Sequence, residues 1–452
     1  MLRSAGVSDL AESQGGLPLL QFFARARDNW LTTFPEAAYR LPIVEQRFLW
    51  RRSYLLSDPA GIKHVLLDNA ANYAKTAIAR ALLEPGLGKG LITMEGETWR
   101  QRRRALAPSF DHQSLLDYAP MIGDVAEKLG ERWAERAGAV VEMNHEMMAT
   151  TLRVISRTML SSDTEAMIDL VGNAVRRYQG GLRPSLLDFL GLPDWVPRPG
   201  RKRVAEGALG EFNRAIAGLI DAHRRTPGER QDFLSRLLAA RIEETGEGFS
   251  DREIRDHLVT ILMAGHETTS VALSWVWYLL SQHPADEAKL HAELDTVLGG
   301  RTPRQEDMAR LPYTRMVIEE AMRLYPPAHT MSRAALGRDE ICGQRIARGT
   351  IVFIVPWILH RHHSLWQRPE EFDPERFRPE AAQSRSRFAY IPFGAGPRIC
   401  IGAAFAMMEI MIVLATLAQR FRPRLVAGHK VEPFGMITLR MRHGLRMTLE
   451  PR

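Results

Sequence analysis

The stretch that decides the fold is Phe393-Gly-Ala-Gly-Pro-Arg-Ile-Cys-Ile-Gly402, near the C-terminal end of a chain of 452 residues. It places Cys400 in a loop constrained by glycine and proline that runs into an apolar helical pattern. A thiolate near a helix N-terminus has a lowered pKa, because unpaired N–H groups and the helix dipole favour negative charge there. Glycines let such a loop aim several N–H groups at one sulfur, which tunes a metal-bound ligand. On these residues alone, Cys400 is either a metal ligand or a small buried hydrophobe beside a turn.

The whole pattern, Phe393-x-x-Gly396-x-Arg398-x-Cys400-x-Gly402, resembles the haem-ligand loop of the cytochrome P450 family, the haem-thiolate monooxygenases. The resemblance implies that Cys400 is the iron ligand and that the cofactor is haem b. Where many relatives have a basic or polar residue after the last glycine, this chain has Ala403 and Ala404. The resemblance implies that further residues of the loop contact the haem: Phe393, Gly394, Arg398, Gly402 and Ala406.

The family fold is expected over residues 35–452, as one catalytic domain after an N-terminal lead-in of residues 1–34. The resemblance implies a mainly α fold with a small β part, with the haem between a long distal helix and the proximal helix after the cysteine loop. Helical periodicity dominates from Ser114 to Gln282, interrupted by the proline-rich segment 191–200. A helix is expected over residues 58–67, strand-like runs over 335–360, and after Cys400 an apolar helix to about Arg420 and a strand pair.

Composition narrows the function classes. Hydrophobic residues make up 45% of the chain and charged residues 25%, as in ordinary globular proteins. Two cysteines exclude a disulfide framework and a four-cysteine iron–sulfur centre, and Cys342 is expected to be structural, at the end of a strand. The net charge of +7 is dispersed, without nucleic-acid-binding motifs, so we expect an acidic protein partner and no nucleic acid.

The N-terminus lacks an uninterrupted apolar segment of signal-peptide or anchor length. The longest purely apolar run, Ile351–Leu359, has the length of a strand and contains a proline. We therefore expect a cytoplasmic protein without a membrane anchor, and a monomer.

The apolar segment Leu258–Leu280 contains the sequence Ala264-Gly265-His266-Glu267-Thr268. A helix that is apolar all round is buried, so a carboxylate in its middle is costly unless it is used or paired. Gly265 lowers helix propensity by about 1 kcal/mol relative to alanine, and the Thr268 hydroxyl can bond an upstream carbonyl or a molecule bound beside the helix. From the residues alone, this segment is either an acid–alcohol pair for proton transfer or a locally loosened helix.

The sequence from Ala264 to Thr268 resembles the oxygen-binding motif of the cytochrome P450 family, and Glu267 stands at the motif's acidic position. The resemblance implies that Glu267 and Thr268 are catalytic and deliver protons during oxygen activation, while Ala264 and Gly265 contact the haem. His266 is expected to point into packing or a surface bond.

Glu320 and Arg323 lie three residues apart, on one face of an expected helix. Such a pair contributes little on a surface. Here it resembles the family's Glu-x-x-Arg motif, and Pro374-Glu-Arg-Phe377 resembles the motif that supplies a third member, Arg376. The resemblance implies a buried network of Glu320, Arg323 and Arg376 that serves folding and haem retention.

Haem propionates require cationic or N–H donors. Trp99 and Arg103, four residues apart on an expected helix, match the family's Trp-x-x-x-Arg pair. Arg398 and Arg333 match the other usual propionate partners. The resemblance therefore adds Trp99, Arg103 and Arg333 to the expected haem contacts.

The resemblance implies a monooxygenase that inserts one atom of O2 into a lipophilic substrate: a fatty acid, terpenoid, steroid or aromatic. Only about fifty residues follow Cys400, so electrons are expected from a separate NAD(P)H-driven ferredoxin or flavodoxin system. The resemblance places the substrate pocket at residues 77–87, 183–195, 264, 328–330 and 434–437, which are largely apolar.

Two alternatives stay open. One is a haem-thiolate isomerase, dehydratase or peroxygenase, which needs no redox partner. The other is a non-catalytic haem-binding sensor with a sixth protein ligand such as His266 or His329. The acid–alcohol pair Glu267-Thr268 disfavours the first, and neither histidine sits in a known ligand motif.

Overall fold

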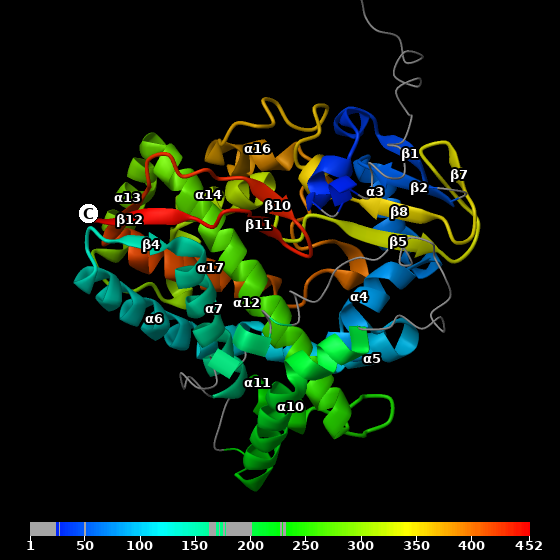
Figure 1. Cartoon of the computed structure of the whole chain (residues 1–452), viewed down its shortest axis with the longest axis horizontal. Coiled ribbons are helices and arrows are strands. Elements are labelled where there is room, and N and C mark those ends of the chain that lie inside the picture. Colours follow the sequence, from blue (N-terminus) through cyan, green and yellow to red (C-terminus); the bar gives the residue numbers. More distant parts are fainter. Residues whose placement is uncertain are drawn as a thin grey trace, which may run out of the picture. The chain divides into compact units, whose positions relative to one another are not determined.

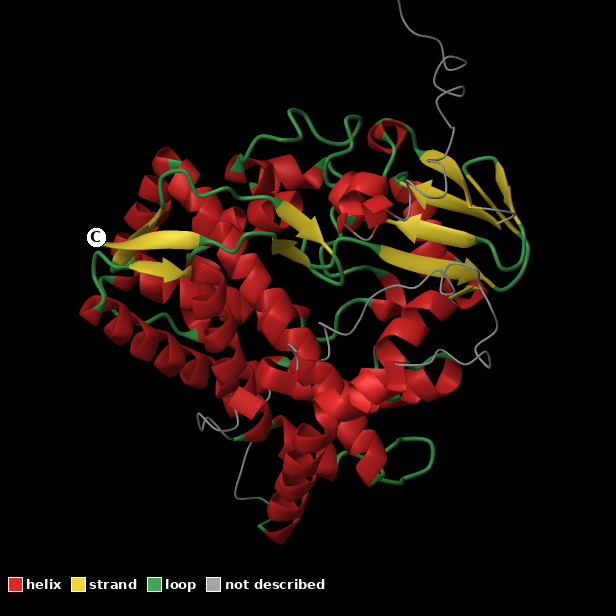
Figure 2. Ribbon diagram, in the orientation of Figure 1, coloured by secondary structure: helices red, strands yellow, loops and turns green. Residues whose placement is uncertain are grey.

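The computed structural model describes residues 24–26, 28–48, 51–161, 169–170, 172–174, 177, 201–226, 228 and 232–452. Helices dominate and strands form a smaller part (Figures 1 and 2), which confirms the predicted fold class. The contacts divide the chain into two units. The first comprises residues 1–76, 319–400 and 432–442, and the second comprises residues 77–318, 401–431 and 443–452.

The first unit is built on a five-stranded sheet with the order β1-β2-β8-β5-β3. Only the β2–β8 pair is parallel; the other neighbours are antiparallel. Side chains from β2, β5 and β8 pack with Ile62 and Val65 into an apolar core. Its strands are β1 (Ile43–Phe48), β2 (Arg51–Leu56), β3 (Tyr73–Ala74), β5 (Met331–Ala335) and β8 (Ile351–Ile354).

Two hairpins and several short helices complete the first unit. The hairpins are β6 (Asp339–Ile341) with β7 (Gln344–Ile346), and β10 (Pro433–Gly435) with β11 (Leu439–Met441). The helices of this part of the chain are α3 (Pro59–Lys63), α15 (Pro356–Leu359), α16 (Pro379–Gln383) and the C-terminal turns of α14 (Pro312–Leu324).

The second unit centres on α12 (Asp251–Gln282), the long green helix of Figure 1. A capping box starts this helix: Ser250 Oγ accepts from the Glu253 N–H, and the Glu253 carboxylate accepts from the Ser250 N–H at 3.0 Å. Around it lie α4 (Ala77–Leu87), α5 (Gly96–Leu106), α6 (His112–Glu135), α7 (Met143–Leu160), α10 (Arg201–Arg225), α11 (Phe233–Ala239), α13 (Pro284–Leu298) and α17 (Ala403–Ala418).

Aromatic packing fixes the core of the second unit. Trp133 of α6 lies 6.0 Å from Trp277 of α12 and 5.5 Å from Phe421 of β9 (Phe421–Leu425), measured between ring centroids. Tyr118 of α6 meets Phe405 of α17 edge to face at 5.7 Å. Buried aromatic rings contribute large apolar areas, so these contacts hold α6, α12 and α17 together.

Local assignments differ from the sequence prediction at three places. The expected 58–67 helix is α-helical only to Lys63 and continues as a π-helix over His64–Asp68. The helical region contains a strand, β4 (Val140–Glu142), which pairs with β12 (Arg446–Pro451). The last strand-like run ends at Ile354, because Pro356 with its fixed φ begins α15. The predicted break at 191–200 and the pocket segment 183–195 lie outside the described residues.

Candidate functional site: a cysteine loop, a buried ion-pair network and a polar strip on α12

The cysteine loop is fixed by its own backbone. The Cys400 N–H donates to the Phe393 carbonyl at 2.9 Å, and the Gly394 N–H donates to the Ile391 carbonyl at 3.0 Å. Gly394 and Gly396 have φ values of 73° and 69°, which only glycine adopts without strain. A Cβ on Gly396 would stand 1.8 Å from the Leu66 carbonyl oxygen, so no other residue fits there. The exposed Cys400 thiol is thus presented on a defined backbone, three residues before α17 begins.

A sheet face with an arginine adjoins this loop. The Cβ position of Gly394 lies 3.9 Å from Met331 Cε on β5. Met331 and Arg333 are two residues apart on that strand, so their side chains share one face. Arg333 therefore lies on the same sheet face as Met331, the residue that approaches the loop. Of the other expected propionate partners, Arg398 lies within the loop, and on α5 the Arg103 guanidinium lies 5.8 Å from the buried Trp99 ring.

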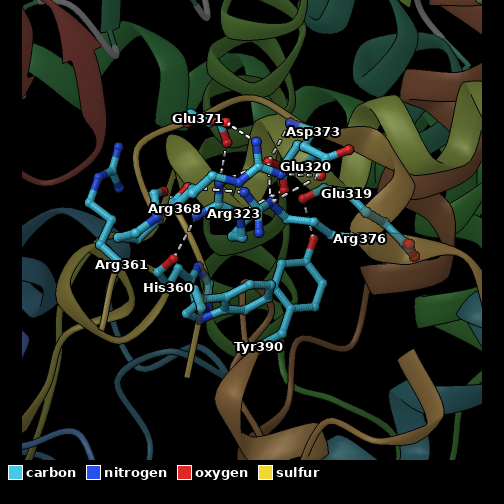
Figure 3. A network of polar contacts seen from close by, with 12 residues as sticks. Glu319, Glu320, Arg323, His360, Arg361, Arg368, Glu371, Asp373, Arg376 and Tyr390 are labelled. Carbon is cyan, nitrogen blue, oxygen red and sulfur yellow. Dashed lines mark hydrogen bonds and ion pairs between the residues drawn. The ribbon is translucent and has the colours of Figure 1, made fainter. Parts of the chain in front are cut away.

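The structure brings Glu320, Arg323 and Arg376 together (Figure 3). Arg323 forms a fork with Glu320, with Nε–Oε2 and Nη2–Oε1 distances of 2.6 and 2.8 Å, and both side chains are 0% exposed. Arg376 Nε lies 3.4 Å from Glu320 Oε1, and the Asp373 N–H donates to the same oxygen at 2.9 Å. Burial raises the pKa of Glu320, and the neighbouring guanidiniums and the Asp373 N–H oppose that shift.

The remaining Arg323 donors reach three backbone carbonyls, those of His360, Pro369 and Glu371, at 2.6 to 2.9 Å. Such carbonyls are otherwise hard to satisfy inside a protein. The network therefore fixes the 360–373 segment as well as pairing charges.

His360 connects the network to the cysteine loop, a link that the sequence analysis missed. Its Nε2 accepts a hydrogen bond from the Ile391 N–H at 3.0 Å, directly before the loop, while its own carbonyl accepts from Arg323. The adjacent Tyr390 hydroxyl donates to the Glu319 carbonyl at 2.8 Å. Figure 3 shows Tyr390 and His360 beneath the ion pairs. A histidine followed by arginine gives no sequence signal for this role, because the contact spans 31 residues.

On α12, side chains donate to a series of helix carbonyls around the predicted motif. Thr268 Oγ1 donates to the Ala264 carbonyl at 2.7 Å, and His266 Nδ1 lies 2.8 Å from the Leu262 carbonyl. Ser270 Oγ donates to the Glu267 carbonyl at 2.8 Å. These side chains form a polar strip on α12 inside an apolar core, and each adds a second donor to a helix carbonyl. Glu267 is buried there, and Thr268 is half-buried.

Gly265 has a packing role that its position in the motif did not reveal. A Cβ on Gly265 would lie 2.8 Å from Ile155 Cδ1 of α7, too close for an ordinary contact. Thr151, also on α7, donates to the His266 carbonyl at 2.8 Å. The glycine thus permits the close approach of α7 to α12. The predicted haem contacts of Ala264 and Gly265 stay predictions, as do those of Gly402 and Ala406 at the start of α17.

The histidines considered as a sixth ligand make other contacts. His329 is buried, with Nε2 2.9 Å from the Met436 carbonyl and Nδ1 2.8 Å from Thr330 Oγ1. His266 is buried and bonds its own helix. Cys342 occupies the turn between β6 and β7 with φ 49°, and burial together with Asp58 raises the pKa of its thiol to about 11. Within the described residues, no helix combines the length and apolar character needed to cross a membrane.

Comparison with known proteins identifies the family. The cytochrome P450 family model matches residues 19–441. Cyclooctatin synthase of Streptomyces melanosporofaciens is 38% identical over 97% of this chain and 95% of its own length. Cyclooctat-9-en-7-ol 5-monooxygenase of the same organism is 35% identical over 85% of this chain and 83% of its own. A crystal structure of a cytochrome P450 aligns with a TM-score of 0.83 and 26% identity, covering 97% of this chain and 98% of that one. The chain belongs to the cytochrome P450 family and is a haem-dependent monooxygenase.

Proposed function

We propose that residues 35–452 form a monooxygenase domain that hydroxylates a terpenoid, with electrons from a separate NAD(P)H-driven ferredoxin or flavodoxin system. The observation that carries the proposal is the cysteine loop, which presents an exposed thiol on a backbone that two left-handed glycines define.

The chain's donors fit a haem. Cys400 supplies the thiolate, and the arginine on the sheet face beside its loop, Arg333, supplies positive charge for a propionate. Arg398 and the Trp99–Arg103 pair are the other proposed propionate partners. When bound, the haem supplies the oxygen-activating chemistry, which an electron-donating thiolate favours. Glu320, Arg323, Arg376 and His360 hold the loop that carries the thiolate.

Glu267 and Thr268 are the proposed proton-delivery pair. Glu267 is a buried carboxyl on the polar strip of α12, shielded from bulk water. Thr268 Oγ1 donates to the Ala264 carbonyl, and its hydroxyl would exchange this bond for one to a molecule bound beside α12. Proton delivery by a positioned hydroxyl avoids admitting water to an apolar pocket.

A terpenoid substrate is supported by two things. Two relatives are named for cyclooctatin synthesis and for oxidation of cyclooctat-9-en-7-ol. In this chain, the described pocket segments 328–330 and 434–437 carry apolar side chains that are exposed or half-exposed, including Ala328, Met436 and Ile437. An apolar surface of this kind binds hydrocarbon skeletons.

The first test is spectroscopic. The reduced protein under carbon monoxide should give the strongly red-shifted Soret band of thiolate-ligated haem, and Cys400→Ser should abolish that band. Cys342→Ser is the matched control and should keep it, because Cys342 lies in a turn of the β6–β7 hairpin. A band at the position of histidine-ligated haem in the wild type would refute the proposal. Turnover of cyclooctat-9-en-7-ol with a ferredoxin system then tests the substrate class, and turnover with peroxide alone would favour the peroxygenase alternative.

A further inference from the structure

A buried histidine joins the two described pocket segments. His329 is 2% exposed and lies two residues before β5 begins at Met331. Its Nε2 is 2.9 Å from the carbonyl oxygen of Met436, 107 residues later in the chain. Its Nδ1 is 2.8 Å from Thr330 Oγ1. Both ring nitrogens are therefore engaged by the segments expected to line the pocket.

The partners fix the direction of both hydrogen bonds. A carbonyl can only accept, so His329 Nε2 carries the proton that bonds Met436. Burial lowers the pKa of His329 to about 4, so the ring is neutral near pH 7 and Nδ1 accepts. The Thr330 hydroxyl must then donate to His329. Thr330 offers a ligand its oxygen lone pairs and its methyl group, while its proton is already used.

The β10–β11 hairpin is also held from a second side, through strand β10. Asn29 Oδ1 accepts from the Gly435 N–H at 3.0 Å, and Asn29 Nδ2 donates to the Pro433 carbonyl at 2.8 Å. A Cβ on Gly435 would lie 2.7 Å from Leu31 Cγ and 3.3 Å from His329 Cε1, so the end of β10 packs tightly against both residues. The Leu439 N–H also donates to the Pro327 carbonyl at 3.0 Å.

These contacts leave apolar side chains uncovered. The Met436 carbonyl turns inward to His329, while the next residue, Ile437, is 43% exposed. Ala328 is exposed on the other segment. Burying a neutral imidazole costs free energy, because the ring must be fully desolvated. The two hydrogen bonds of His329 offset that cost and at the same time fix the two segments relative to each other.

We propose that His329 is a specificity-determining positioning residue: by joining the Met436 carbonyl to the Ala328–Thr330 segment, it sets the apolar surface that orients the substrate. This rests on the proposed monooxygenase function. The side chains of Ala328, Met436 and Ile437 are apolar, as contact with a hydrocarbon skeleton requires. Thr330 can accept a hydrogen bond from a substrate hydroxyl but has no proton for a carbonyl, so an alcohol is preferred over the matching ketone.

Three variants distinguish the effect of losing the two hydrogen bonds of His329 from the effect of losing a buried ring. His329→Gln keeps an N–H near the position of Nε2 and should preserve the contact with Met436. His329→Leu removes both hydrogen bonds at similar volume. His257→Leu is the matched control: His257 is also fully buried, on α12 against Phe249, with no hydrogen-bond partner for either ring nitrogen among the described residues.

Three readouts follow. Amide hydrogen exchange of the peptide over residues 434–439 needs no substrate, and His329→Leu should accelerate it about tenfold while the other two variants do not. Substrate affinity is measured by titrating the haem-loaded protein and following the change in haem spin state. Wild type should bind cyclooctat-9-en-7-ol about tenfold more tightly than the matching ketone, and His329→Leu should lose this preference. The ratio of hydroxylation products should shift by about fivefold or more in His329→Leu and stay near the wild-type value in His329→Gln and His257→Leu.

If amide hydrogen exchange is unchanged in His329→Leu, His329 does not hold the 434–439 segment in place, and the proposal is overturned. Faster exchange with unchanged product ratio and unchanged alcohol preference overturns the specificity role. In a further outcome, the wild type gives the thiolate band but neither binds nor oxidises the alcohol. In that case the proposed terpenoid substrate fails, and the specificity role of His329 fails with it. The hydrogen-exchange data would still decide whether His329 holds the 434–439 segment.

Discussion

At the scale of single residues, the site depends on a buried carboxylate, that of Glu320, and on one hydroxyl group, that of Thr268. The Glu320 carboxylate lies between the guanidiniums of Arg323 and Arg376, and its side chain is 0% exposed. Glu320→Gln leaves the Arg323 charge buried without a counter-charge, and we expect a loss of about 3–5 kcal/mol in the free energy of unfolding. Urea denaturation of the haem-loaded protein measures it. Glu371→Gln, which changes an exposed pair with Arg368, should cost less than about 1 kcal/mol. Equal losses in the two variants would contradict the buried-network argument.

Thr268 tests the proton-delivery role at the same scale. Thr268→Ala should keep the carbon monoxide band and lower the rate of product formation about a hundredfold, because a positioned proton donor is removed. Thr150→Ala is the matched control, since Thr150 Oγ1 makes the same kind of bond, to the Glu146 carbonyl at 2.7 Å, on α7. Steady-state turnover compares the two. A rate loss of the same size in both variants would assign Thr268 a merely structural role.

At the scale of elements, the approach of α7 to α12 depends on one absent methyl group. Gly265→Ala places a Cβ 2.8 Å from Ile155 Cδ1, and overpacking of this kind costs about 1–3 kcal/mol. Ile155→Val deletes that Cδ1, so the double variant should recover most of the loss, with a coupling energy of about 1 kcal/mol. Thermal unfolding of the four proteins in the cycle measures it. Additive effects would mean that the helices separate instead of repacking.

At the scale of the whole molecule, several buried histidines make stability depend on pH. Burial lowers the pKa of His257 and of His329 to about 4, and lowers that of His360 well below its ordinary value. These rings are neutral when folded but take up protons near pH 6.5 when unfolded. Stability is therefore complete above about pH 6.5 and falls as pH decreases toward 4, by about 1.4 kcal/mol per pH unit for each ring.

The melting temperature measured from pH 8 to pH 4.5 tests this. The curve should be flat above about pH 7 and fall steeply below about pH 6. His257→Leu removes one titrating ring and should make the acid limb shallower, even if it lowers the plateau. An unchanged acid limb in that variant would show that His257 is not neutral in the folded protein.

The sequence by itself determined the family, the mainly helical fold and the residues of three motifs. These signals are local: glycines beside a cysteine, a polar group inside an apolar helix, and charges three residues apart on one helix face. The long helix with the oxygen-binding motif and the apolar helix after Cys400 can both be predicted from hydrophobic periodicity along the chain, without knowledge of the segments that pack against them.

Only the tertiary structure decided what those residues touch. β4 forms inside a helical region because β12, some 300 residues later, pairs with it. His360 bonds Ile391, His329 bonds Met436, and Gly265 faces Ile155, and none of these pairs has a spacing that a local pattern could reveal. The physical reason is that a hydrogen bond or a close packing contact depends on distance in space, which the folded backbone sets, whereas periodicity and motifs record only distance along the chain.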